Sequence, residues 1–386
     1  DVDGFVEFER IASGLGSELF ETFADADPQF GRFSPQTQAI LRGSAAELVE
    51  RCVQTPVLQA TLATDGLIGT FAGPRSQGTG YVLAHHYAGR AMGEQGAWGF
   101  VRGGMGSISN ALASAARGNG ALIFADTSVA HIVVKAGRVR QIELNDGTVI
   151  GAKVIASNAH PITTFTKLVK DAVFDDAFSR RLRDWKTTGP SLKVNFALGE
   201  LPSFTCRPGS NPQAHHRATI HVAPTIEYLQ SAYEDGAAGR PSRAPMLECF
   251  MQTPTDPTLA PPGKHILSVF AQYYPYDRAD GWSERAREEA ADQIVALLAQ
   301  YAPNIPNAIE ARQVLSPADL EQRFGLAGGH IFHGELLPGQ IYEDRFATRT
   351  PLAGLYLCGS GAHPGGCVSG FPGKRAAAAM LADLKL

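Results

Sequence analysis

The spacing of apolar residues predicts that helices dominate residues 1 to about 100. A first helical stripe lies in GFVEFERIASGLGSELFETF and consists of Phe5, Phe8, Leu15, Leu19 and Phe23. Gly14 and Gly16 weaken the case for one continuous helix in that stretch. A second stripe consists of Ile40, Leu41, Leu48, Val49 and Cys52.

The pattern changes at Trp98 to glycine turns, one helix and short strands. The segment GGMGSISNALASAARG predicts a helix over about 106–118. Lys135-Ala136-Gly137 and Asn145-Asp146-Gly147 mark tight turns between alternating apolar runs, which indicates an antiparallel meander. The run AKVIASNA then predicts a short buried strand.

Residues 161 to about 350 mix strand and helix patterns, as expected for an α+β domain. SLKVNFAL alternates apolar and polar residues, KHILSVFAQY is rich in β-formers, and SERAREEAADQIVALLAQYA is a long amphipathic helix. The chain then returns to a buried strand in GLYLC, a glycine-dense loop and an alanine-rich helix.

Composition narrows the class of protein without identifying a partner. The 386 residues are 44% hydrophobic and 19% charged with a net charge of −4, which is typical of a globular protein and gives no general attraction to nucleic acid. The five cysteines form no C-x-x-C pair, which argues against a disulfide scaffold or zinc site and favours a reducing cytoplasm. We find no basic-then-apolar leader and no apolar run of about 18 residues, so we expect neither a signal peptide nor a spanning helix.

Two glycine loops are the candidates for ligand binding. In the first, the strand Leu355–Leu357 is followed by a loop from Cys358 and then a helix, an arrangement that turns free backbone N–H groups toward an anion. Lys374 and Arg375 near the start of this helix are disfavoured by its dipole unless an anion or solvent offsets them. The alternative is a plain strand-to-helix connection.

The second loop, Arg102 to Gly106, also opens a helix. Taken alone, this loop fits a packing role as well as a ligand-binding role. The two loops together are stronger evidence for a ligand site than either loop alone. We find no strand–GxGxxG–helix unit with an acidic residue about 20 positions further on, which is the usual ADP-binding fingerprint.

Long segments of the chain resemble FAD-dependent oxidoreductases related to phytoene desaturases, and among them the branch called pyridine nucleotide-disulfide oxidoreductase domain-containing protein 2. The resemblance covers nearly all of the chain. It rests on GAWGFVRGGMGSISNALASAA, VIASNAHPITTF, KVNFAL, TIHVAPTIEYLQSAYEDGAAGRPSRAPMLE, LAPPGKHILSVFAQYYPY, GLAGGHIFHGEL and GLYLCGSGAHPGGCVSG.

The resemblance implies an α/β plus α+β fold, in which an incomplete Rossmann-type FAD domain of the amine oxidase and phytoene desaturase kind is interleaved with a mixed substrate domain. We expect residues 1–102 to form the helical part of the substrate domain and 103–160 the middle segment of the FAD domain. Residues 161–350 would then complete the substrate domain, and 351–386 would end the FAD domain.

The same resemblance implies which residues contact FAD. Gly359 and Ser360 would lie near the pyrophosphate and ribityl chain, Gly366 to Ser369 near the flavin ring, and Val129 near the adenine. The full set of implied cofactor contacts is Arg102, Gly103, Gly104, Met105, Val129, Gly359, Ser360, Gly361, Pro364, Gly365, Gly366, Cys367, Val368 and Ser369. No metal is expected.

The implied activity is removal of hydride from an organic, apolar substrate to FAD. Catalytic residues stay unassigned, with His333 and His363 as candidates and Trp98, Phe100, Tyr273 and Tyr274 as candidate pocket walls, each with a structural alternative. An amine oxidase on the same scaffold and a non-catalytic binding or scaffold protein are the alternatives.

The expected partners follow from the missing ADP-binding unit. We expect an N-terminal Rossmann fragment or subunit, a small-molecule substrate, no nucleic acid and an oligomeric assembly. Peripheral contact with a membrane is left open.

Overall fold

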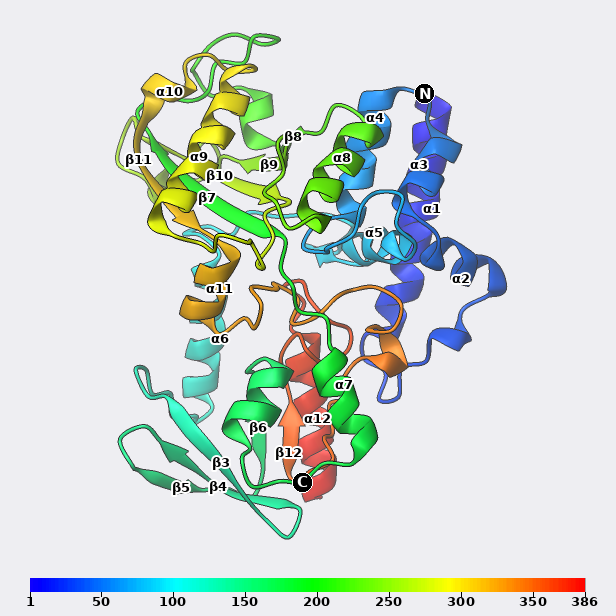
Figure 1. Cartoon of the computed structure of the whole chain (residues 1–386), viewed down its shortest axis with the longest axis vertical. Coiled ribbons are helices and arrows are strands. Elements are labelled where there is room, and N and C mark those ends of the chain that lie inside the picture. The colour runs from blue at the N-terminus through cyan, green and yellow to red at the C-terminus, as the bar shows by residue number, and fades with distance from the viewer. Residues whose placement is uncertain (386) are drawn as a thin grey trace.

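A computed structural model describes residues 1–385, which form two bodies joined by long loops (Figure 1). The upper body contains the N-terminal helices, a five-stranded sheet and the helices around it. The lower body contains two small sheets and two helices, one of which is the C-terminal helix. None of the helices in residues 1–385 is long and apolar enough to cross a membrane.

The N-terminal helices confirm the predicted helical region. They are α1 (Val2–Thr22), α2 (Pro35–Arg42), α3 (Ala45–Cys52), α4 (Pro56–Ala63) and α5 (Thr79–Tyr87). α1 is continuous through Gly14 and Gly16. A Cβ at Gly16 would lie 2.4 Å from the Tyr87 carbonyl oxygen, so glycine is needed there for the close approach of α5. A short hairpin, β1 (Arg90–Ala91) with β2 (Glu94–Gln95), follows α5.

The large sheet is antiparallel, in the order β11-β7-β10-β9-β8. Its strands are β7 (Ser191–Leu198), β8 (Ile220–Val222), β9 (Met246–Phe250), β10 (His265–Gln272) and β11 (Ile309–Leu315). The helices of this region are α8 (Ile226–Ala237), α9 (Glu284–Ala299), α10 (Ile305–Ala308) and α11 (Pro317–Phe324). Ala291, Ile294 and Leu298 of α9 pack on the sheet in one apolar core, while α8 packs with α3 and α4 in another. The predicted strands in SLKVNFAL and KHILSVFAQY and the helix after Ser283 are confirmed.

The lower body holds two small sheets. The predicted meander is confirmed as β3 (Val129–Lys135), β4 (Arg138–Leu144) and β5 (Val149–Gly151). The strands β6 (Ile155–Ser157) and β12 (Leu355–Leu357) form a parallel pair although they are far apart in the sequence. Helices α7 (Asp176–Asp184) and α12 (Phe371–Leu384) belong to the same body, and α6 (Gly106–Gly118), predicted over the same residues, connects the bodies (Figure 1).

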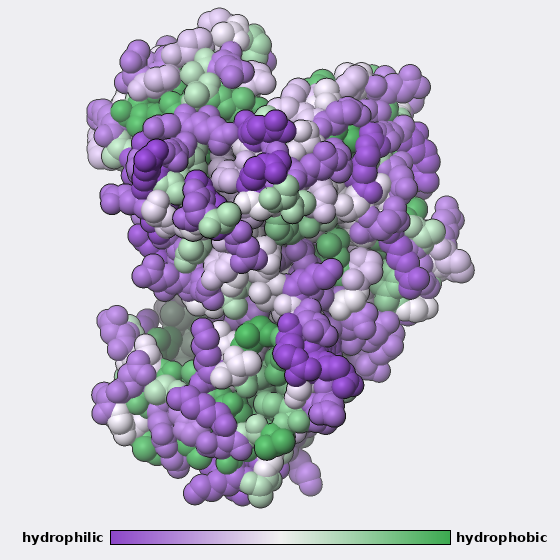
Figure 2. All heavy atoms as spheres, in the orientation of Figure 1, coloured by the Kyte–Doolittle hydropathy of each residue, from purple (hydrophilic) through white to green (hydrophobic). Residues whose placement is uncertain are grey.

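An aromatic and aliphatic cluster forms the core of the lower body. Phe165, Leu182 and Trp185 pack there with Leu355 and Leu357 of β12. This body also exposes apolar patches on the face seen in Figure 2. The division into four segments proposed from the sequence stays a prediction.

Candidate functional site

The C-terminal glycine loop follows a strand and opens a helix, as its sequence predicts. β12 ends at Leu357, residues 358–370 form the loop, and α12 begins at Phe371. Gly370 is the N-cap residue with φ +70° and offers no side chain to cap the first turn of α12.

The first part of the loop, residues 359–366, is packed into the protein. A Cβ on Gly359 would lie 2.5 Å from the Asn158 side-chain oxygen, and one on Gly366 would lie 1.8 Å from the Phe332 ring. A Cβ on Gly361 would lie 2.2 Å from Pro161. Intramolecular packing by itself therefore requires glycine at these positions.

The second part of the loop, residues 367–370, is exposed and lies at the N-terminus of α12. Val368 is 76% exposed, and the Ser369 hydroxyl accepts a 3.4 Å hydrogen bond from the Phe371 N–H. Arg375 turns inward instead, where its guanidinium donates to the His363 carbonyl at 2.7 Å. A hydrogen bond within the protein therefore satisfies Arg375, the cation that the helix dipole disfavours at this position.

Arg345 holds the buried part of the loop in place. Its guanidinium is only 2% exposed and donates to the carbonyl of Ser360 at 2.6 Å. It also donates to the carbonyls of Phe332, Glu335 and Gln340 at 2.6–2.9 Å. A buried cation is tolerated when its donors are satisfied, so Arg345 fixes the loop to the segment 332–340.

The loop of Arg102, Gly103, Gly104 and Met105 is anchored elsewhere. The Gly103 N–H donates to Asp256 Oδ2 at 2.6 Å. Among residues 1–385, no hydrogen bond or ion pair joins this loop to residues 358–369. Val129, by contrast, packs against the same apolar cluster as Leu355 and Leu357, which directly precede the C-terminal loop in the sequence.

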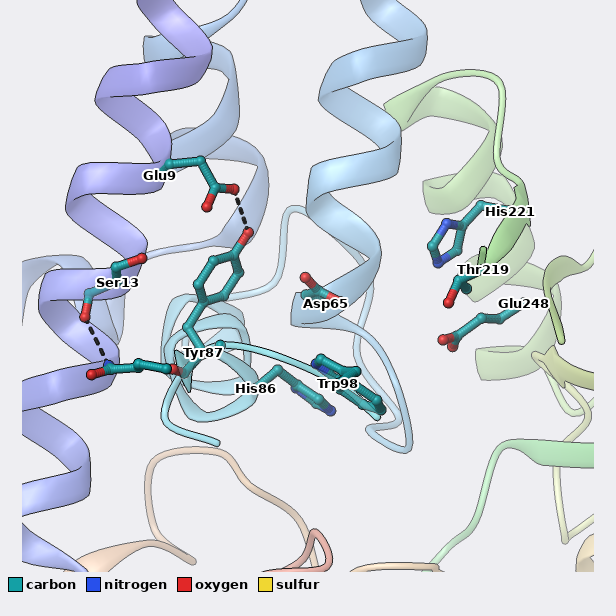
Figure 3. Close-up of a pocket in the computed structure, with 11 residues that line it drawn as sticks. Glu9, Ser13, Asp65, His86, Tyr87, Trp98, Thr219, His221 and Glu248 are labelled. Atoms are coloured by element: carbon teal, nitrogen blue, oxygen red, sulfur yellow. Dashed lines mark hydrogen bonds between the residues drawn. The ribbon is translucent and has the colours of Figure 1, made fainter. Parts of the chain in front are cut away.

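A cavity of about 350 Å³ opens in the upper body (Figure 3). Its acidic side chains come from three separate segments, with Glu9 on α1, Asp65 after α4 and Glu248 on β9. The remaining lining residues are Ser13, His86, Tyr87, Gln95, Gly96, Trp98, Thr219 and His221. The cavity is therefore acidic and partly aromatic.

The last turn of α5 lies between this cavity and the glycine loop. His85 Nε2 is 3.4 Å from the Gly366 carbonyl oxygen, whereas His86 lines the cavity. Successive helix residues point in different directions, so neighbours on one turn reach both places. Phe332 packs between them, against Gly366 and 6.4 Å from the His86 ring.

One wall of the cavity is a ring stack. The Trp98 indole lies parallel to the His86 imidazole, with centroids 6.0 Å apart and an interplanar angle of 8°. Burial lowers the pKa of His86, and burial lowers the pKa of His221 to about 4, so both rings are neutral at pH 7. The Tyr87 hydroxyl donates to Glu9 at 2.9 Å (Figure 3).

Two of the carboxyl groups hold their protons unusually tightly. Burial raises the pKa of Asp65 to about 7, and the charge of Glu9 adds to the effect. Burial likewise raises the pKa of Glu248 to about 7, with a further contribution from Asp65, while Lys193 opposes it. Such perturbed carboxyl groups in a cavity are typical of functional sites.

The structure separates the aromatic and histidine candidates. Trp98 does line the cavity, and Phe100 instead packs edge-on against Phe250 at 6.5 Å. The interpretation of Tyr273 and Tyr274 as pocket walls is wrong, because both are fully buried core residues. Their hydroxyls donate to the Ala72 carbonyl and to Gln293.

Both candidate histidines are buried and neutral. His363 Nε2 lies 3.2 Å from the Thr22 carbonyl oxygen, and burial lowers its pKa to about 3. His333 stacks on His160 with ring centroids 5.1 Å apart, and burial lowers its pKa to about 4. These contacts favour a structural role for each. No group of three or more His, Cys, Asp or Glu side chains is placed to hold a metal ion within residues 1–385.

Sequence reasoning missed the acidic residues of the cavity. Glu9, Asp65 and Glu248 are isolated in the sequence and form no motif. Glu9 lies on the polar side of the first helical stripe, and nothing nearby distinguishes it from a solvated glutamate. Only the fold brings the three together.

Comparison with known proteins identifies relatives over most of the chain. The mouse (Mus musculus) protein named pyridine nucleotide-disulfide oxidoreductase domain-containing protein 2 is 41% identical over 363 residues, which cover 91% of this chain and 62% of that protein. The lycopene-forming phytoene desaturase of Pseudescherichia vulneris is 27% identical, with 100% of this chain and 76% of that protein covered. The chain thus spans about 62% of the length of the mouse relative.

Solved structures share the fold. A putrescine oxidase matches 100% of this chain and 76% of its own with a TM-score of 0.58 at 14% identity. Cyclohexylamine oxidase from Brevibacterium oxydans matches 98% of this chain and 75% of its own with a TM-score of 0.52 at 17% identity. These likenesses confirm the predicted fold class. Residues 21–381 match the family described as flavin containing amine oxidoreductase, and the chain therefore belongs to that family.

Proposed function

We propose that this chain is the substrate-binding and flavin-side portion of an FAD-dependent oxidoreductase, completed by a segment that carries the GxGxxG unit. That segment would belong either to the same polypeptide or to a separate subunit. Membership of a flavin-containing family supports the proposal, and so does the strand, glycine loop and helix at residues 355–384. We also propose a cytoplasmic location, in keeping with five free cysteines.

The residues present suit the flavin end of FAD. The exposed part of the glycine loop, residues 367–370, lies at the N-terminus of α12, where backbone N–H groups and the helix dipole favour negative charge. Ser369 and Val368 would contact the cofactor there. The adenine end has only Val129 from this chain, so the completing segment would supply the rest.

One observation carries the proposal: the parallel pair β6–β12 has an open edge. The far edge of β12 is occupied, because Thr350 donates to the Leu355 carbonyl and Leu357 donates to the Thr348 carbonyl. The far edge of β6 pairs with no strand in the part of the chain that the structure describes. Parallel sheets normally contain more than two strands and are covered on both faces. We therefore expect a further strand to pair with the free edge of β6.

Two further features suit a covering segment. No residue of α6 is buried, although the helix is rich in small and apolar residues and carries Arg117 as its one charged residue. Leu122, Ile123 and Phe124 after it form no strand and are 82%, 44% and 70% exposed. Apolar surface of this kind marks an interaction site, and the GxGxxG segment is the occupant we propose.

When bound, FAD would supply the hydride-accepting chemistry. This chain would bind and orient the substrate. The last turn of α5 contacts both the cavity, through His86, and the glycine loop, through His85. The neutral His86 and the Trp98 ring would form a wall that limits water.

The test is reconstitution. We expect the chain to bind FAD and turn yellow when it is produced together with the GxGxxG portion of a relative, and to purify with that portion. Flavin absorbance and size-exclusion chromatography provide the measurement. A stable, colourless chain that takes up neither the segment nor FAD would support the non-catalytic alternative.

Substrate oxidation separates the remaining alternatives. Bleaching of the flavin by a polyene supports a desaturase, and bleaching by an amine supports an amine oxidase. The acidic cavity favours an amine oxidase, because a hydrocarbon substrate would offer no polar partner to its three carboxyl groups. Oligomerisation and peripheral membrane contact stay predictions.

A further inference from the structure

A second cavity, of about 250 Å³, lies in the lower body next to α7. Phe165, Phe346 and Leu357 are nearly fully buried and form its deep walls, and Phe178 of α7 adds a further ring. Arg181, one turn further along α7, also lines the cavity. An apolar space with a few polar groups at defined places is the usual form of a small-molecule site.

Arg181 is a partly buried cation with too few acceptors. Burial lowers the pKa of three arginines in residues 1–385, which are Arg181, Arg345 and Arg375. Arg345 donates to four carbonyl oxygens and Arg375 to two. Arg181 donates to one, that of Asp344, and forms no ion pair with a carboxylate in the described part of the chain. A guanidinium carries five N–H donors, so an acceptor is missing here.

Aromatic rings hold the Arg181 guanidinium in place. Its central carbon lies 4.9 Å from the centroid of the Phe346 ring and 5.9 Å from that of Trp185, and such cation–π contacts stabilise the arrangement. Because the side chain is already ordered, an acceptor that binds to it costs little further side-chain entropy. The planar guanidinium matches a carboxylate, which accepts two of its N–H hydrogen bonds at once.

The other arginine that lines the cavity is already paired. Arg349 donates from Nε and Nη2 to the two carboxylate oxygens of Asp383, at 2.9 and 3.0 Å. The lining itself includes neither aspartate nor glutamate. The cavity therefore has one cation without a carboxylate partner, surrounded by rings, and a ligand that matches it has one negative charge and an apolar body.

The cavity lies on the side of β12 that faces away from the open edge of β6. Arg349 and Thr350 belong to the segment that occupies this side, where the Thr350 N–H donates to the Leu355 carbonyl. A strand added at β6 extends the sheet in the opposite direction, so the site does not depend on the proposed function. It also shares no lining residue with the acidic cavity of the upper body.

We infer that this cavity binds a small apolar carboxylic acid as its anion, with Arg181 donating to the carboxylate and Phe165 and Phe346 contacting the apolar body. Alkanoates and arylalkanoates share this chemistry. The site is a ligand site separate from the one at which the substrate of the proposed oxidoreductase would bind.

The experiment is titration calorimetry of the full chain at neutral pH with octanoate and 3-phenylpropionate. The corresponding alcohols, 1-octanol and 3-phenylpropan-1-ol, are the uncharged probes, and inorganic phosphate is the anion without an apolar body. We expect carboxylate binding, and we expect the alcohols and phosphate to bind at least about tenfold more weakly. The tighter of the two carboxylates identifies the body of the ligand as alkyl or aryl.

Two variants test the two halves of the site. Arg181→Gln removes the charge but keeps an N–H donor for the Asp344 carbonyl, and it should weaken carboxylate binding by about tenfold or more. Ala347→Phe fills the cavity from an exposed position of its lining and should abolish binding even if the first variant fails to fold. Arg183→Gln is the matched control, because Arg183 lies on the same helix, is exposed and does not line the cavity.

Thermal melts establish which variants are folded. The inference is overturned if the parent chain binds neither carboxylate, or binds the alcohols or phosphate as tightly as the carboxylates. Unchanged carboxylate binding by folded Arg181→Gln or folded Ala347→Phe would overturn it as well, because the ligand would then occupy another place.

Discussion

The two bodies of the molecule differ in how completely their polar and apolar groups are matched. In the upper body, the strands β7 and β10 have partners on both edges and α9 covers the sheet. In the lower body, the two-stranded sheet has a free edge at β6, and α6, which connects the bodies, has no buried residue. Under the proposed function, the exposed groups of the lower body are where the completing segment would bind, whereas the upper body is expected to need no such segment.

Arg345 is where the bodies meet, and its loss should have the largest effect. Phe332 packs with the upper helices, and Ser360 lies in the lower glycine loop; both give carbonyl oxygens to Arg345. Arg345→Met leaves four buried carbonyls unpaired and should lower the free energy of unfolding by about 3–5 kcal/mol. Urea unfolding measures this, and we expect the single transition to split in two.

Arg349→Met is the control for the loss of a guanidinium. Arg349 pairs with Asp383 on the surface, where both side chains are substantially exposed, so its loss should cost less than about 1 kcal/mol. Equal losses for the two variants would mean that Arg345 does not join the bodies.

The acidic cavity is the exception to the good matching of the upper body, and Glu248→Gln should reveal its cost. The pKa of Glu248 rises from 4.5 to about 7 on folding, so the folded protein holds this proton more tightly than the unfolded chain. The stabilisation that the folded protein gains by binding this proton more tightly is fully present below pH 4.5. It is lost as the pH rises through about 7.

The variant carries no charge to bury, so it should be more stable than the parent by up to about 3 kcal/mol at pH 8. The gain should shrink steadily as the pH falls toward 4.5. Unfolding in urea at pH 8 and pH 5 gives the comparison. A variant less stable than the parent at pH 8 would show that Glu248 has a partner in the folded protein.

The sequence predicts well what is encoded by neighbouring residues. Turn tripeptides predict the meander, and the glycines before Ser107 predict α6 to the residue. The cavity depends on Glu9, Asp65 and Glu248, whose proximity is created by the fold alone. Tyr273 and Tyr274 follow directly after β10, and the residues around them do not distinguish a pocket wall from the aromatic core residues that they are.

Two glycines of α1 offer a smaller test of how tightly the upper body is packed. A Cβ at Gly16 would meet the Tyr87 backbone, whereas one at Gly14 meets nothing within 4 Å. Gly16→Ala should lower the free energy of unfolding by about 1–3 kcal/mol. Gly14→Ala should raise it by about 0.5–1 kcal/mol through helix propensity.

Thermal denaturation of the two variants checks the difference. Opposite shifts in melting temperature are expected from the same chemical change two residues apart. Similar shifts would mean that α1 and the end of α5 are not in tight contact.

A change on α6 should have the smallest effect on stability and yet a clear effect on assembly. Leu112 lies on α6 and is 68% exposed, and Val57 on α4 of the upper body is 55% exposed. Leu112→Ser and Val57→Ser should each change the free energy of unfolding of the chain by less than about 0.5 kcal/mol, because neither side chain is packed. Urea unfolding measures this for both.

Their effects should part when the GxGxxG segment is added. If α6 is the surface that this segment covers, Leu112→Ser places a hydroxyl in an apolar interface and weakens capture of the segment about tenfold, whereas Val57→Ser leaves capture unchanged. Co-purification and flavin content measure capture. Equal capture by both variants would mean that the segment does not bind to the exposed apolar residues of α6. The open edge of β6 would then have to bind the segment without them.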